Sequence, residues 1–259
     1  MPMVERPDAE IYYESHGTGP RCVVFAHGRG GNAASWWQQI PVFAARHRVI
    51  VFDHRGFGRS RCAPEAFHTR HFAADLLAVL DHAGVARAAL VCQSMGGRTG
   101  VGMAVEAPQR LDALVLACTP GGIDVPESRE AGRRRREAAD DARFGILALA
   151  ADYPAREPAM ATLYEQIRAF NTGPGPRGLD GGATDWVAPS ALAALRVPTL
   201  MITADEDQIF PPPVLHAVAP HIPGVEVVDL VGVGHSTYFE DAPTFNRVVG
   251  EFLGRHLGP

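Results

Sequence analysis

Short apolar runs alternate along this chain with longer segments whose apolar residues recur at helical spacing. The runs are rich in β-branched residues and end near Gly, Pro or Asp, which is typical of strands covered on both faces. Strands that alternate with helices form a mostly parallel sheet, because each crossover returns the chain in the same direction. We therefore expect an α/β fold. The expected strands are residues 22–26, 48–52, 88–91, 111–116, 199–203 and 225–230, with a further edge strand over 9–15.

Helical spacing is clearest in residues 70–83, 95–107 and 244–257, each of which places apolar side chains on one face. These segments fall between expected strands or after the last one. They are therefore predicted to be amphipathic helices that cover the sheet, with one face toward its apolar strands and the other toward water.

The regular alternation stops after Pro120 and returns near residue 190. The segment between contains a basic run at residues 133–136, followed by Glu137, Asp140 and Asp141 at helical pairing distances. We interpret this run as a solvated helix face rather than an anion site. The domain organisation expected is a core of residues 1–121 and 190–259, with residues 122–189 inserted as a cap.

The composition argues against several classes of function. The 259 residues are 46% hydrophobic and 20% charged, which is ordinary for a globular protein that can bury a core. A formal net charge of −5 provides no global positive field for nucleic acid or anionic lipid. Residues 1–14 lack the apolar core of a signal peptide, and no apolar run is long enough to span a bilayer. We expect a cytoplasmic protein with a small-molecule substrate, and no nucleic-acid or membrane partner.

The four cysteines are scattered, with no Cys-x-x-Cys pair. Free thiols are expected, and Cys22, Cys92 and Cys118 lie in or beside apolar runs, where a thiol packs as a small hydrophobe. His68 and His71 are too few for a zinc site, which needs three or four ligands, and no other cluster of His and Cys supplies the rest. Neither a metal nor a cofactor is expected.

The sequence Leu-Val-Cys-Gln-Ser-Met-Gly-Gly, which ends at Gly97, runs from an expected strand directly into an expected helix. This is the setting of a nucleophile elbow, in which a sharp turn strains the backbone of a serine and holds its Oγ clear of the sheet. Gly96 and Gly97 would let the helix approach closely. Cys92 stands where the pattern Gly-x-Ser-x-Gly has its first glycine, so we expect a slightly crowded elbow around the nucleophile, Ser94.

A serine hydroxyl is a poor nucleophile at neutral pH, so a base has to accept its proton and a carboxylate has to orient that base. His235 is the candidate base, because it lies in a glycine-rich loop after the last expected strand. Three carboxylates, Asp205, Glu206 and Asp207, follow the expected strand 199–203. The residues alone leave the choice of the orienting acid open.

Together these motifs resemble the α/β-hydrolase family over nearly the whole chain apart from the cap. The chain also has a His27-Gly28 loop after its first buried strand, and a D-x-R-G-x-G-x-S turn at residues 53–60 whose polar residues are expected to be structural. Dehalogenases and epoxide hydrolases of this fold have Asp at the elbow. Ser94 therefore indicates the serine-using branch, and the resemblance is strongest to esterases and enol-lactonases.

The resemblance implies roles for particular residues. The family's acid loop has a small residue, two variable residues, Asp and, four positions later, Pro, and here Ala204, Asp207 and Pro211 fill those places. It therefore selects Asp207 as the orienting acid. Backbone N–H groups are expected to stabilise the oxyanion, one from Met95 after the nucleophile and one, by position, from Arg29.

The resulting hypothesis is hydrolysis of a small or medium carboxylic ester or lactone through an acyl-enzyme on Ser94. Two alternatives stay open: hydrolysis of a carbon–carbon bond in a diketone or dienol substrate, and a slowly reacting ligand-binding protein. An arginine that projects into the pocket, from Arg29, Arg98 or the cap, would favour a carboxylate-bearing lactone. Aromatic residues that could form an apolar pocket wall are Trp36, Trp37, Phe144, Trp186, Phe210 and Tyr238.

Overall fold

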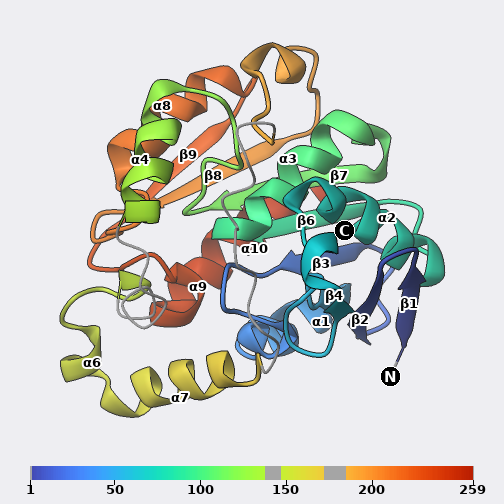
Figure 1. Cartoon of the computed structure of the whole chain (residues 1–259), viewed down its shortest axis with the longest axis horizontal. Helices are drawn as coiled ribbons and strands as arrows, with labels where there is room; N and C mark the ends of the chain where they lie inside the picture. Colours follow the sequence, from blue (N-terminus) through green and yellow to red (C-terminus); the bar gives the residue numbers. More distant parts are fainter. Residues whose placement is uncertain (1, 138–146, 172–184, 259) are drawn as a thin grey trace.

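The computed structural model describes residues 2–137, 147–171 and 185–258. A nine-stranded sheet occupies the centre of this described part, and helices cover both of its faces (Figure 1). The strand order is β1-β2-β4-β3-β6-β7-β8-β9, and β5 pairs with β2 beside this path. The strands are β1 (Met3–Arg6), β2 (Ala9–His16), β3 (Cys22–Ala26), β4 (Arg48–Phe52), β5 (Arg61–Cys62), β6 (Ala88–Gln93), β7 (Leu111–Ala117), β8 (Thr199–Ala204) and β9 (Glu226–Leu230).

The six strands from β4 across to β9 are parallel to one another, as their apolar sequences predict. All six were expected, with ends that differ by one or two residues, and the α/β fold class is confirmed. The expectation that residues 9–15 form an edge strand is wrong. β2 pairs antiparallel with β4 on one side and with β1 on the other, so β1 is the edge. Four residues of mixed polarity in β1 carry too little pattern to be recognised as a strand.

Alternate residues of each central strand enter two different cores. In β3, Val23 and Phe25 pack toward α1 (Ile40–Ala44) and α10 (Ala242–Leu257), whereas Val24 and Ala26 pack toward helices on the other face. Those helices are α2 (Phe72–His82), α3 (Gly97–Glu106) and α8 (Pro212–Val218). The three predicted helices are therefore confirmed, and α10 begins slightly earlier than expected because the Asp241 carboxylate accepts from the N–H of Thr244 at 3.1 Å.

Short 3-10 helices make most of the remaining turns. They are η1 (Ala33–Trp36), η2 (Pro64–Ala66), η3 (Thr69–His71), η4 (Ser94–Gly96), η5 (Pro108–Arg110), η6 (Pro189–Leu192) and η7 (Ala219–His221). The short helix α9 (Thr237–Glu240) follows the loop after β9. Among all described helices, none combines the length and the apolar character that crossing a bilayer requires.

Between β7 and β8 the chain forms α4 (Pro126–Glu137), α6 (Tyr153–Arg156) and α7 (Pro158–Ala169). α4 lies beside α8, while α6 and α7 extend away from it below the sheet (Figure 1). The two ends of the insertion meet: the N–H of Asp124 donates to the carbonyl of Val187, and the N–H of Val187 donates to the carbonyl of Gly122, both at 2.9 Å. These two hydrogen bonds bring residues 122–124 beside Val187.

The basic run starts on the exposed surface of α4. The carboxylate of Glu130 binds Arg133 at 2.7 Å and Arg134 at 2.8 Å, one turn before them in the helix. Acidic partners were expected after the run. The carboxylate that pairs with Arg133 and Arg134 precedes them, which is the favoured order for an i, i+4 pair on a helix. Asp140 and Asp141 lie outside the described residues.

Candidate active site

The residues expected to act together come from the carboxyl ends of neighbouring parallel strands. Ser94 follows β6, Asp207 lies in the loop after β8, and His235 lies in the loop after β9. In an open α/β sheet this edge is where ligands bind, because the loops there converge from several strands. The side-chain amide of Gln93 donates to the backbone carbonyl of His235 at 3.2 Å, so the loop that carries His235 is attached to the residue before Ser94.

Ser94 has a φ of 50°, the left-handed conformation that side chains other than glycine rarely adopt. Gly96 and Gly97 have to be glycines, because neighbouring atoms leave no room for a side chain at either position. A Cβ on Gly96 would lie 2.2 Å from the carbonyl oxygen of Ala26, and one on Gly97 would lie 2.3 Å from Oγ1 of Thr119. The chain therefore turns sharply at Ser94 and places the start of α3 directly against the ends of β3 and β7, as the elbow motif predicts.

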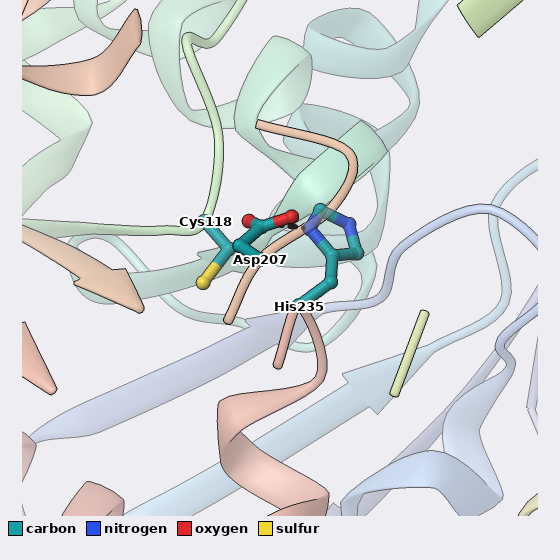
Figure 2. A group of neighbouring side chains, drawn as sticks. All are labelled: Cys118, Asp207 and His235. Atoms are coloured by element: carbon teal, nitrogen blue, oxygen red, sulfur yellow. Dashed lines mark hydrogen bonds and ion pairs between the residues drawn. The ribbon is translucent and has the colours of Figure 1, made fainter. Parts of the chain in front are cut away.

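His235 and Asp207 form a buried pair. Nδ1 of His235 lies 2.8 Å from Oδ2 of Asp207, and both side chains are almost fully excluded from solvent (Figure 2). The other oxygen of Asp207 accepts from the N–H groups of Ile209 and Phe210 at 2.8 and 2.9 Å. Since a carboxylate only accepts, Nδ1 of a neutral His235 carries the proton and Nε2 is its acceptor. Nε2 is buried and has no hydrogen-bond partner among the described residues.

The geometry separates the three carboxylates that follow β8. Asp207 is buried and pairs with His235. Asp205 is exposed, and its Oδ1 accepts from the N–H of Gly232 at 2.8 Å, which ties the acid loop to the histidine loop. Glu206 is exposed as well. Asp207 is thus the carboxylate in a position to orient the imidazole.

Cys118 completes a group of three possible metal ligands, the one such group in the described ranges. Its Sγ, a carboxylate oxygen of Asp207 and a ring nitrogen of His235 lie within 4.8 Å of one another (Figure 2). Burial raises the pKa of the Cys118 thiol well above its ordinary value, which favours the protonated thiol beside the Asp207 carboxylate. Nδ1 of His235 is also engaged by the carboxylate. This donor set fits a hydrogen-bonded cluster and does not fit a metal site.

The loop expected to supply the second oxyanion donor is held by His27. The N–H of His54 donates to Nε2 of His27 at 2.9 Å, which leaves Nδ1 to donate to the carbonyl of Gly28 at 2.7 Å. Burial lowers the pKa of His27 to about 4, so the ring is neutral near pH 7. A turn closed by the Gly31 N–H and the Gly28 carbonyl at 3.0 Å then presents Arg29 at its tip.

Gly28 lies directly against the elbow. A Cβ at this position would stand 2.0 Å from Oε1 of Gln93 and 3.0 Å from Cβ of Ser94. The oxyanion loop can therefore approach the nucleophile only because residue 28 has no side chain. Met95, the residue expected to give the other donor, is buried in η4 immediately after Ser94.

The polar residues of the turn at 53–60 hold the backbone, as expected. Asp53 accepts from the N–H groups of Ala33 at 2.6 Å and Arg59 at 2.7 Å. Arg55 makes two hydrogen bonds of 2.6 Å to the buried carboxylate of Asp75. These bonds connect the turn to η1 and α2. The side chains of Asp53 and Arg55 therefore have a structural role.

A model of the alpha/beta hydrolase fold family matches residues 21–242. The chain belongs to the α/β-hydrolase family. A relative from Variovorax paradoxus, named "Putative carbamate hydrolase RutD", is 30% identical and is covered over 98% of its length by 96% of this chain. The family, the fold and the named activities of such relatives make this protein a hydrolytic enzyme.

Two solved structures resemble this hydrolase over nearly their whole length. Est816, described as an N-acyl homoserine lactone degrading enzyme, is 28% identical with a TM-score of 0.82, and the match covers 97% of this chain and all of that one. A thermophilic esterase from Thermogutta terrifontis, with malate bound, is 27% identical with a TM-score of 0.81, over 98% of both chains.

The aromatic residues suggested for the pocket wall of this hydrolase have different surroundings. Trp36 is fully buried in the core between Phe25 and Tyr238, with ring centroids 4.9 and 4.6 Å away. Tyr238 itself lines a narrow cavity beside the oxyanion loop, and the ring of Phe210 lies 5.9 Å from that of His235. Trp37 is 43% exposed, Trp186 lies under the guanidinium of Arg98, and Phe144 lies outside the described residues.

Sequence reasoning missed Glu240, which positions the loop of the candidate base. One oxygen of its carboxylate accepts from the N–H of Gly234 at 3.1 Å and from that of Ala150 at 3.0 Å, a residue of the insertion. Burial raises its pKa. Nothing in the local sequence indicates this role, because Ala150 lies far away along the chain. Gln93 was within reach of prediction, since it directly precedes the nucleophile.

Proposed function

We propose that this hydrolase cleaves a small or medium carboxylic ester or lactone through an acyl-enzyme on Ser94. His235 takes the Ser94 proton, Asp207 holds the imidazole, and the N–H groups of Met95 and Arg29 bind the oxyanion. The observation that carries the proposal is the buried pair of His235 and Asp207 at 2.8 Å, with Nε2 of the ring free of any partner in the described part of the chain. An unused buried acceptor on an oriented imidazole is what a general base requires.

The reaction follows from these positions. As Oγ of Ser94 attacks the carbonyl carbon, its proton passes to Nε2 of His235, and Asp207 stabilises the resulting imidazolium. Charge develops on the carbonyl oxygen, and each preorganised backbone donor stabilises it by roughly 3 to 4 kcal/mol. His235 then gives the proton to the leaving alkoxide. Water, deprotonated by the same ring, attacks the acyl group and restores Ser94.

We also propose that residues 122–189 act as a cap over this site. Three contacts support it: the bridge between Ile123 and Val187, the hydrogen bond from the Ser236 N–H to the Ala148 carbonyl at 3.0 Å, and the bond of 2.9 Å between the hydroxyls of Tyr164 and Ser236. The last two join the insertion to the residue after His235. Relatives named for lactone degradation and ester hydrolysis support the same class of substrate.

Turnover of p-nitrophenyl acetate or butyrate, and labelling by a fluorophosphonate probe, test the proposal. Both should occur in the natural protein and disappear in Ser94→Ala, while Ser190→Ala, an exposed serine, should keep both. Ester turnover that persists in Ser94→Ala would remove this residue as the nucleophile. A far larger kcat/KM for a diketone ring-cleavage product than for any ester would replace ester hydrolysis by carbon–carbon bond hydrolysis.

A further inference from the structure

Arg168, in the last turn of α7, lies against the oxyanion loop. A Cβ built on Gly30 would lie 2.8 Å from its Nη1 and 3.2 Å from its Cζ, so the guanidinium fills the space where residue 30 has no side chain. The Arg168 side chain is only 17% exposed. Its Nε and Nη1 atoms are buried, and neither has a hydrogen-bond partner among residues 2–137, 147–171 and 185–258.

The charge of Arg168 is only weakly compensated. The nearest carboxylate, on Glu165, lies 3.5 Å from Nε, beyond a good charge-assisted hydrogen bond, and its side chain is 56% exposed. The guanidinium carbon lies 5.8 Å from the ring centroid of Tyr164 on the preceding turn. Burying a guanidinium whose Nε and Nη1 donors are unused costs free energy. A bound acceptor would offset this cost.

Two asparagines fix Arg168 relative to the loop. The side-chain amide of Asn171 donates to the Gly30 carbonyl at 2.7 Å, and that of Asn32 donates to the Ile167 carbonyl at 2.8 Å. The Ile167 carbonyl also accepts from the N–H of Phe170 at 3.3 Å, so the bond from Asn32 attaches the last turn of α7 to the oxyanion loop. The guanidinium therefore has a set position beside the residue expected to bind the oxyanion, Arg29.

Arg168 also lines a small cavity beside the oxyanion loop. Gly28 and Gln93 form its wall on the side of the sheet, and Tyr164 and Tyr238 contribute to the other walls. Gly28 lies close to Cβ of Ser94, and Gln93 directly precedes Ser94 in the chain. A ligand group held by Arg168 would therefore lie beside the oxyanion loop, close to the turn that carries Ser94.

We infer that Arg168 binds a carboxylate on the substrate, so that the preferred substrates are acidic esters or lactones. This inference rests on the proposed ester hydrolysis at Ser94. A planar carboxylate matches the fork of donors on a guanidinium and can take two parallel hydrogen bonds, which a neutral carbonyl cannot. The other candidate arginines are less suited: Arg98 donates to the Asp185 carbonyl at 2.9 Å and stacks on Trp186.

The test compares two esters of nearly equal shape, monomethyl glutarate and its neutral amide counterpart, methyl glutaramate. In the natural protein kcat/KM should be higher for the acid. In Arg168→Gln the ratio of acid to amide should fall by roughly 10- to 100-fold, the contribution of a charge-assisted hydrogen-bonded pair. Arg168→Lys should recover part of the ratio. Arg156→Gln, an exposed arginine of α6 paired with Asp152, should leave the ratio unchanged.

A binding measurement separates this inference from the proposed chemistry. Glutarate should raise the Tm of the natural protein and of Ser94→Ala, and it should have little effect on Arg168→Gln. A ratio near one in the natural protein, or equal losses for both esters in Arg168→Gln, would overturn the role of Arg168. Absence of all ester turnover and of fluorophosphonate labelling would instead overturn the proposed function, while the Tm shift with glutarate would still report on Arg168.

Discussion

The sulfur of Cys92 occupies the space that a side chain at Gly100 would need. A Cβ on Gly100 would lie 2.8 Å from Sγ of Cys92 and the same distance from Cδ1 of Leu114. The sequence predicted a crowded elbow, because Cys92 replaces the usual first glycine of the motif. In the structure, Gly100, one turn into α3, leaves room for the sulfur of Cys92. The helix can therefore still pack closely against β6 although residue 92 is not glycine.

This pairing predicts a coupling between the two positions. Gly100→Ala gains about 0.5 to 1 kcal/mol of helix propensity but overpacks against the sulfur at a cost of roughly 1 to 3 kcal/mol, so a net loss of stability is expected. In a Cys92→Ala background the clash with the sulfur is removed while the contact with Leu114 remains, so the same change should cost less stability. Urea unfolding of the four proteins measures the coupling; an equal loss in both backgrounds would show that Cys92 and Gly100 act independently.

A pair of aspartates tests the choice of the orienting acid. Asp207→Asn should lower kcat by roughly 10³- to 10⁴-fold, because an amide no longer holds the imidazole in the tautomer that leaves Nε2 as acceptor. Asp205→Asn keeps an oxygen that accepts from the Gly232 N–H, so its activity should stay within about threefold, the scale of an exposed contact. Steady-state kinetics of both variants with p-nitrophenyl butyrate measure these losses in kcat. A larger loss in Asp205→Asn than in Asp207→Asn would make Asp205 the orienting acid.

Gly28 should be intolerant of any side chain. Gly28→Ala places a Cβ 2.0 Å from Oε1 of Gln93 and 3.0 Å from Cβ of Ser94, so the Gln93 side chain and the oxyanion loop have to shift relative to Ser94. Loss of an aligned donor predicts a fall in kcat of roughly 10²- to 10³-fold. Gly250→Ala, in open space on α10, is the matched control and should retain activity. Comparable kinetics for the two variants would show that the loop does not need this close approach.

His27 predicts a loss of stability in acid. Burial lowers its pKa in the folded protein to about 4, against 6.5 for an unperturbed histidine. Between these values the unfolded chain binds the proton and the folded one does not, so stability is complete above about pH 6.5 and falls as the pH drops toward 4. The contribution is roughly 3 kcal/mol.

His27→Gln should be less stable near pH 7, because the bonds to His54 and Gly28 are disturbed, and its unfolding free energy should change less steeply between pH 6.5 and 4. Urea titrations across this range, compared with those of the natural protein, measure the slope. His54, whose pKa burial also lowers, keeps its own share of the pH dependence in both proteins. An unchanged slope would mean that His27 is already protonated in the folded state.

Much of the fold could be read from local patterns. The parallel strands and their covering helices were predictable, since burial on two faces leaves long apolar runs and burial on one face leaves helical spacing. The strained turn at Ser94 was predictable too, because the small residues around it are required within a few positions of the serine. β1 was missed because four residues carry too little pattern.

The sequence alone was sufficient for the family, the fold class and the order of the motifs along the chain. It could not supply the contacts between residues far apart along the chain: Glu240 beside Ala150, and Arg168 beside Gly30. Such contacts depend on how the insertion folds back onto the loops at the sheet's edge, and no local periodicity records that. A motif specifies the backbone geometry around a reactive side chain within a few residues of it. The buried surroundings that set pKa values and substrate preference form only when distant segments of the chain pack together.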